Sequence, residues 1–252
     1  CEAVVKHEAV KSMATMVFVG NMLLSTHEED DRSVLRFWYI ENGIIYNREE
    51  MTTRIGNKEA SYADAIISGV GNVRIVVGGE GAVYASEVHQ WATKSRKFEL
   101  NSLDVNRLGN IFDKVLITNG LTIASNSKHV LVWSDLKTPP KQYALENFIK
   151  HSHLAVNKDK TKVLVGAVES RNGSTGGVAM VDLEKETMVR LHGDGKTTDK
   201  FQADFVFFDD GDNPSYHCTY KKKFNCELKH VEGYDSDTDS ASDSSTGESS
   251  SE

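Results

Sequence analysis

The chain has 252 residues, of which 39% are hydrophobic and 8% aromatic, and its formal net charge is −8 at pH 7. A chain of this length can form one large all-β domain or two small domains. The sequence contains no run of about 18 apolar residues, which excludes a membrane-spanning helix. Its cysteine content of three residues favours a reducing, intracellular compartment.

The region from His7 to Tyr46 predicts four short antiparallel strands. Gly20-Asn21 forms a tight turn after the first strand, and an acidic loop at Glu28–Asp31 precedes the third. Both residues of Asn42-Gly43 tolerate positive φ, which makes this pair a strong hairpin signal. Four such strands, with a tryptophan near the end of the third, are typical of one propeller blade. The predicted strands are Val10–Val19, Met22–Thr26, Ser33–Ile40 and Ile44–Tyr46.

The polar residues of this first unit follow an order that resembles the WD40 repeat. In that repeat, side chains of four types hydrogen-bond across one blade, and a buried indole N–H and a buried carboxylate both need such partners. The residue after the tryptophan is tyrosine here, where the repeat usually has aspartate. The resemblance implies a blade network of His7, Ser25 or Thr26, Asp31 and Trp38.

Further units repeat the same order of strand, glycine-containing turn and strand. Trp91 and Trp133 end strands at the place that Trp38 occupies in the first unit, and Asp182 stands where the aspartate of the Trp-Asp pair would stand. Another antiparallel fold such as a sandwich would also bury tryptophans, but the shared position favours an all-β propeller of four-stranded antiparallel blades. The propeller is assigned to residues 1–232, with blades at about 7–50, 60–103, 111–147, 151–192 and 201–231.

Five recognisable blades are fewer than the seven that the resemblance implies. An incomplete ring would expose sheet faces and edges at its ends. The chain also begins with cysteine rather than methionine. We therefore expect either part of a larger propeller whose N-terminal portion is missing or additional strands that diverge from the pattern.

Motifs for catalysis and cofactor binding are incomplete. Gly193–Thr197 ends like a phosphate-binding loop, but Arg190 stands where the first glycine of that loop would be. Cys218 and Cys226 are not at a usual zinc-ligand spacing. Lys221–Lys223 is a basic cluster without the extended basic stripe of a nucleic-acid-binding face. We expect no catalytic residues, metal or other cofactor, no direct nucleic-acid binding and no membrane contact.

The last twenty residues, 233–252, predict a disordered acidic tail. They contain no aliphatic residue larger than alanine and carry most of the net negative charge. Hydroxyl residues among these acids resemble sites for an acidophilic kinase such as casein kinase 2. Such a tail would be a regulated ligand for basic proteins or simply a solubilising segment, and it slightly favours the nucleus over the cytoplasm. The candidate phosphosites are Ser236, Thr238, Ser240 and Ser242.

The resemblance implies a non-catalytic protein–protein interaction scaffold, because a propeller presents variable loops on a rigid frame. One alternative is a nuclear or nucleolar factor that binds chromatin or ribosome-assembly components. A second alternative is a propeller enzyme with convergent titratable groups at the channel mouth. Loops at 28–31, 78–81 and 126–128 would form one face of the propeller. Candidate partner-binding residues in these loops are Glu28, Glu29, Asp30, Glu80, Asn126 and Lys128.

Overall fold

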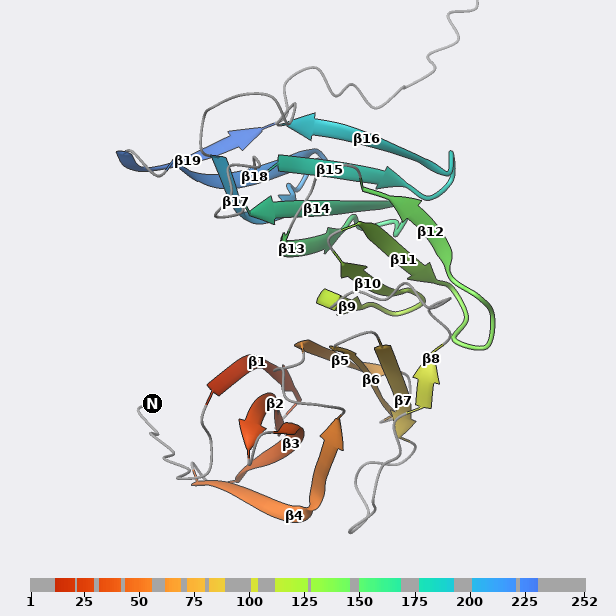
Figure 1. Cartoon of the computed structure of the whole chain (residues 1–252), viewed down its shortest axis with the longest axis vertical. Helices are drawn as coiled ribbons and strands as arrows, with labels where there is room; N and C mark the ends of the chain where they lie inside the picture. The colour runs from red at the N-terminus through yellow and green to blue at the C-terminus, as the bar shows by residue number, and fades with distance from the viewer. Residues whose placement is uncertain are drawn as a thin grey trace, which may run out of the picture.

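The computed structural model is all-β over the residues that it describes. These strands form five antiparallel sheets, numbered here in chain order from the first sheet to the fifth sheet (Figure 1). The described residues are 12–20, 22–29, 32–41, 44–55, 62–68, 72–79, 82–88, 101–103, 112–126, 128–145, 150–168, 177–192, 201–220 and 223–230.

Each sheet is built from strands that follow one another in sequence and pair antiparallel with their neighbours. The first sheet contains β1 (Ser12–Val19), β2 (Met22–Glu29), β3 (Arg32–Glu41) and β4 (Ile44–Ile55). The second sheet contains β5 (Tyr62–Ser68), β6 (Asn72–Gly79), β7 (Ala82–Val88) and β8 (Asn101–Leu103). The third sheet contains β9 (Phe112–Ile117), β10 (Thr122–Asn126), β11 (His129–Trp133) and β12 (Lys141–Ala144).

The last two sheets continue this pattern. The fourth sheet contains β13 (Lys150–Val156), β14 (Lys162–Val168), β15 (Gly177–Asp182) and β16 (Thr187–His192). The fifth sheet has three strands within the described residues, β17 (Phe201–Phe208), β18 (Pro214–Tyr220) and β19 (Lys223–His230). Sheets of four consecutive antiparallel strands are the building units of a radial repeat architecture.

The five sheets stack face to face around an arc. Each sheet contributes its first strand to the inside of the arc, so that β1 lies against β5, β5 against β9, β9 against β13 and β13 against β17. Figure 1 shows that the arc is open, with the first sheet and the fifth sheet at its two ends. Sheets that are neighbours in sequence are therefore neighbours in space within the described residues.

A buried apolar cluster fills each of the four spaces between neighbouring sheets. Full burial of one Val, Leu, Ile or Phe side chain contributes about 1.5–3 kcal/mol, so these clusters provide the main drive for stacking. Representative members, from the first space to the fourth, are Phe37 with Ile75, Phe112 with Leu131, Ile123 with Val163, and Leu164 with Val206.

Interior strands are buried on both faces because a neighbouring sheet covers each face. Every residue of β10 and of β15 is buried, whereas β16, the outermost strand of the fourth sheet, is exposed or half-buried throughout. A strand buried on both faces reads as a continuous apolar run, and a strand with one solvated face reads as an alternating one. This explains why alternation is clear in only some of the strands.

Candidate interaction surface and the network behind it

Two residues of the expected blade network meet in the first sheet. The indole N–H of Trp38 donates a 2.7 Å hydrogen bond to Ser25 Oγ, and both residues are buried. Leu23 lies directly opposite Trp38 and Ser25 lies one step along the same face, so register selects Ser25 rather than its neighbour Thr26 as the acceptor of this bond. His7 and Asp31, the other two members, lie outside the described residues.

Two further residues complete the surroundings of the Trp38 side chain. His27 Nδ1 lies 3.3 Å from Ser25 Oγ, and the His27 side chain is fully buried. The guanidinium carbon of Arg36 lies 5.5 Å from the centre of the Trp38 ring, which is a cation–π distance. Sequence reasoning missed both residues, although their two-residue spacing from Ser25 and Trp38 places them on the same face of the sheet.

The other two predicted tryptophans are Trp91 and Trp133, and only Trp133 lies within the described residues. Trp133 ends β11 and is buried against the second sheet with Phe112 and Leu131. Thr122 lies opposite Trp133, and Ala124 takes the place that Ser25 has beside Trp38. The third sheet therefore carries the tryptophan of the network without its hydroxyl acceptor at that place. Trp91 lies outside the described residues.

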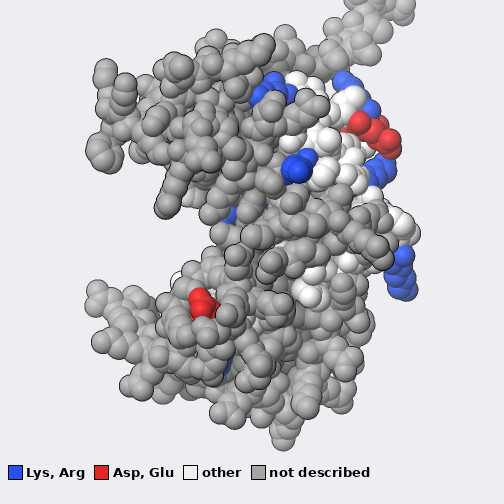
Figure 2. All heavy atoms as spheres, in the orientation of Figure 1, with Lys and Arg blue, Asp and Glu red and all other residues white. Residues whose placement is uncertain are grey.

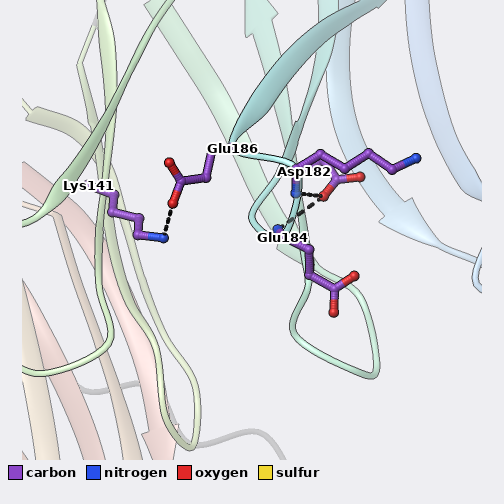
Figure 3. Close-up of polar contacts among 5 residues, drawn as sticks. Lys141, Asp182, Glu184 and Glu186 are labelled. Carbon is purple, nitrogen blue, oxygen red and sulfur yellow. Dashed lines mark hydrogen bonds and ion pairs between the residues drawn. The ribbon is translucent and has the colours of Figure 1, made fainter.

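Asp182 shapes the turn between β15 and β16. Its Oδ1 accepts hydrogen bonds from the backbone N–H groups of Glu184 at 3.1 Å and Lys185 at 2.9 Å (Figure 3). Asp135 plays a similar part in the third sheet, where its Oδ1 accepts from the N–H of Lys137 at 3.0 Å. An aspartate that binds backbone N–H groups two or three residues ahead stabilises a tight turn.

The expected loop face is corrected at five residues, which lie in strands. Glu28 and Glu29 belong to strand β2 and pair with Ser33 and Arg32 of β3, so the predicted acidic loop begins two residues too early. Asn126 is fully buried, and its Oδ1 accepts from the backbone N–H groups of Lys128 at 2.9 Å and His129 at 2.8 Å. Asn126 therefore ends β10 and stabilises the turn with its side chain, and Lys128 is an exposed residue of that turn.

Gly78 and Gly79 are the remaining two corrections, because the glycine-rich run at 78–81 predicted a loop. Gly78 and Gly79 instead lie in β6 and are buried. A Cβ atom on Gly78 would lie 2.7 Å from Cγ1 of Val115 in the third sheet, so glycine permits close stacking of the two sheets. Asp30 and Glu80 lie outside the described residues.

The opposite edge of the sheets carries a row of short turns whose backbones are fixed by polar contacts. We call this set the turn rim. Three of its turns contain a non-glycine residue with positive φ, namely Lys160, Glu186 and Asp212, which is a geometry that tight hairpin turns require. The turn rim consists of residues 118–121, 134–140, 157–161, 183–186 and 209–213.

Side chains join one turn of the rim to the next. Lys160 Nζ donates to the backbone carbonyl of Asn119 in the third sheet. Asn157 Nδ2 donates to Asp212 Oδ2 in the fifth sheet at 2.8 Å, and the other Asp212 oxygen accepts from the backbone N–H of Lys158 at 3.3 Å. Turns of three consecutive sheets are thus cross-linked.

The turn rim and the strand ends beside it carry exposed charges of both signs. One ion pair crosses between sheets, from Lys141 Nζ to Glu186 Oε1 at 2.5 Å, with both side chains exposed (Figure 3). Basic and acidic atoms lie close together on the right-hand edge of the molecule in Figure 2. The exposed charged residues are Asp135, Lys137, Lys141, Lys158, Asp159, Glu184, Lys185, Glu186 and Asp210.

Comparison with solved structures identifies the arrangement of these sheets. The chain matches the crystal structure of the WD40 domain from Toxoplasma gondii coronin with a TM-score of 0.53 and 10% sequence identity. The match covers 86% of this chain and 59% of the coronin chain. The fold is a WD40-like β-propeller. The predicted all-β class with four-stranded antiparallel blades is therefore confirmed.

The propeller assignment rests on structure. No family model and no curated protein sequence matches the chain. The chain spans 59% of the length of the coronin chain that it matches. The tail at 233–252 lies outside the described residues.

Two ionisable side chains join neighbouring blades on the inside of the propeller. Asp64 of β5 accepts hydrogen bonds from the backbone N–H groups of Ile117 at 2.8 Å and Ala65 at 2.9 Å. Burial raises the pKa of the Asp64 carboxyl, and these two hydrogen bonds oppose that rise. Ile117 belongs to the next blade, so the carboxyl links two blades.

His153 of β13 makes the corresponding link between the fourth and fifth blades. Its Nδ1 lies 3.0 Å from the carbonyl oxygen and 3.4 Å from the nitrogen of Val206 in β17. Burial lowers the pKa of His153, the hydrogen bond to Val206 opposes this, and the charge of Lys114 adds to the lowering. Asp64 and His153 thus have structural roles between blades of this propeller.

Within the described residues, no helix has the length and apolar character that crossing a membrane requires. In the same ranges, no three His, Cys, Asp or Glu side chains lie close enough to hold a metal ion.

Proposed function

We propose that the protein is a non-catalytic protein–protein interaction scaffold that binds partners through the turn rim. The observation that supports this is the cross-linking of turns from three consecutive blades, through Lys160 with Asn119 and through Asp212 with Asn157. A surface that is ordered before it binds loses less conformational entropy on binding. WD40-like propellers supply this kind of rigid, loop-bearing frame, which suits an intracellular multiprotein complex.

The exposed charges of the turn rim are the groups that would recognise a partner. Lys137 and Lys158 are exposed on turns of neighbouring blades, with acidic residues nearby. Mixed charges at an interface contribute mainly to specificity and association rate, and a like charge placed opposite a partner charge costs several kcal/mol. Reversal of two rim charges should therefore weaken partner binding without disturbing the fold.

The test is quantitative capture of partners from cell extract. The wild-type chain is compared with the double variant K137E/K158E and with K128E, whose exposed lysine lies in a turn between β10 and β11 on the other edge. The double variant should lose about tenfold of the captured partner, while K128E retains it. Equal capture by all three chains, or no capture by a folded chain, would contradict the proposal.

The tail at residues 233–252 is proposed as a second binding segment. Its acidic residues would bind basic proteins, and phosphorylation at Ser236, Thr238, Ser240 or Ser242 would add roughly −1.5 to −2 charge at each site. A chain that ends at Glu232 tests this role. Recovery of basic proteins by the full chain only would assign them to the tail and would favour a nuclear location. Identical recovery by both chains would leave the turn rim as the binding surface.

A further inference from the structure

The turn between β9 and β10 contains an asparagine followed directly by a glycine, Asn119-Gly120. Such a pair can react with itself, because glycine has no side chain to hinder attack of its backbone nitrogen on the asparagine side chain. Attack forms a bond from Gly120 N to Asn119 Cγ, and the Gly120 proton leaves with the amide group as ammonia. Water then opens the cyclic imide at either carbonyl, which leaves an aspartate or an isoaspartate without any redox change.

The turn leaves both reacting groups accessible. Asn119 and Gly120 are exposed, and within the described residues neither the Asn119 side chain nor the Gly120 N–H makes a hydrogen bond. The turn is closed instead by Thr118, whose backbone N–H and Oγ1 donate to the carbonyl of Leu121 at 2.8 Å and 3.5 Å. Gly120 has a φ of 115°, and a Cβ atom placed there would meet nothing within 4 Å. The nitrogen therefore has open space around it.

Other asparagines in the turns of the described sheets are restrained. The side chains of Asn126, Asn157 and Asn213 each make hydrogen bonds within their own turns. None of these three residues is followed by glycine. Asn119 therefore differs from them both in the freedom of its side chain and in the residue that follows.

A lysine of the next blade contacts the peptide group that would react. Lys160 Nζ donates to the carbonyl oxygen of Asn119, and this carbonyl belongs to the same peptide group as Gly120 N. When Gly120 N loses its proton, negative charge spreads onto that oxygen, because the peptide group is conjugated. A positive charge beside the oxygen stabilises this anion, as a donor in an oxyanion hole does. The contact between blades therefore favours the form of Gly120 N that attacks.

We propose that Asn119 is a site of spontaneous deamidation, and that Lys160 accelerates the reaction by stabilising the Gly120 amide anion. The reaction replaces a neutral amide with a carboxylate, so the turn rim gains a negative charge beside Lys160. In the isoaspartate product, the main chain runs through the former side chain, and the carbonyl to which Lys160 donates becomes a free carboxylate. The age of a chain thus changes the charge of its turn rim, whether or not the rim binds a partner.

The test is incubation of the full chain at neutral pH, followed by proteolysis and mass spectrometry. These measure, at each Asn-Gly pair, the fraction of chains in which the amide has become a carboxylate. Asn42-Gly43 and Asn172-Gly173 are further pairs of this kind and serve as internal references. Lys160→Met keeps the apolar stem of the side chain and removes its charge. The reaction at Asn119 should then slow by about threefold, the size expected for an exposed charged contact, while the reference pairs are unchanged.

Lys158→Met is the matched control. Lys158 is exposed on the same turn as Lys160, and its side chain makes no hydrogen bond within the described residues. The K158M chain should react at Asn119 at the wild-type rate. In urea the blades separate, so the wild-type and K160M chains should then react at Asn119 at equal rates. Far-UV circular dichroism checks that each variant is folded before incubation, and Lys160→Gln replaces K160M if that chain is unfolded.

Three outcomes would overturn the proposal. The first is an intact Asn119 in the folded chain after an incubation in which the urea-unfolded chain reacts at this residue. The second is an equal rate at Asn119 in the folded wild-type, K160M and K158M chains, which would remove the role of Lys160. The third is a K160M effect that persists in urea, because it would not come from the contact between blades.

Discussion

Replacement of Ser25 by alanine should lower the free energy of unfolding by about 2 kcal/mol, within a range of about 1–3 kcal/mol. The change removes the oxygen that accepts the 2.7 Å hydrogen bond from the indole N–H of Trp38. Both residues are buried, so water cannot easily replace the lost acceptor. The missing oxygen leaves a very small cavity, which adds little to the cost.

Thermal unfolding followed by far-UV circular dichroism measures this effect. In a chain of this size, 1 kcal/mol shifts the midpoint by about 2–4 °C, so Ser25→Ala should lower it by about 4–8 °C. Trp38→Phe removes the N–H and keeps an aromatic ring. In that background the same Ser25→Ala change should cost less, because only the 3.3 Å contact of Ser25 Oγ with His27 Nδ1 remains to be lost. An equal loss in both backgrounds would refute the hydrogen-bond explanation.

A substitution at Thr122 serves as a control, because it should raise the free energy of unfolding where Ser25→Ala lowers it. Its hydroxyl is buried and has no hydrogen-bond partner among the described residues. Thr122→Val keeps the shape of the side chain and removes the unpaired polar atom, so it should raise the free energy of unfolding by about 1 kcal/mol. A loss of stability in Thr122→Val would show that the hydroxyl has a partner in solution.

Three further predictions concern individual carboxyl and imidazole groups. The raised pKa of Asp64 means that the folded chain binds the proton of this carboxyl more tightly than the unfolded chain does. The free energy that this group contributes to folding should therefore fall as pH rises above about 4. Asp64→Asn should remove this pH dependence of the unfolding free energy, which urea-unfolding curves measure. The lowered pKa of His153 acts in the opposite direction. The free energy of unfolding should therefore fall as pH drops below about 6.5. In the same assay, the His153→Gln chain should lose less of this free energy at acid pH. Asp182→Ala should cost about 1 kcal/mol and speed hydrogen exchange at Glu184 and Lys185, whereas Glu186→Gln, on an exposed ion pair, should leave both unchanged.

Local patterns in the sequence are sufficient to predict the fold class because each blade is a local unit. Asn-Gly and glycine turns, alternating strands and a tryptophan near the end of the third strand all lie within about 40–45 residues of chain. Strand order follows directly, since each sheet pairs strands in sequence order. Local patterns could not choose between Ser25 and Thr26 as the partner of Trp38. This choice required the register of β2 with β3, which places Ser25 beside Trp38.

The errors arose where contacts beyond the residue type decide the role of a residue. Gly78 looks like a loop residue in sequence, and its real partner is Val115, in another blade. Asn126 looks like an exposed turn residue, but its side chain turns inward to bind the backbone of the turn that follows. Glu28 is charged, as loops often are, and still extends β2. The outcome at Gly78 depends on another blade, whereas those at Asn126 and Glu28 depend on how the strand and turn around each residue are arranged.

Exposure is the property that is furthest from local sequence. Met16 and Phe18 of β1 follow the same alternation as residues of the other first strands, and they are 58% and 70% exposed. Alternation determines which residues share a face of a sheet. Burial depends instead on whether another sheet covers that face, and this is decided by residues in other blades.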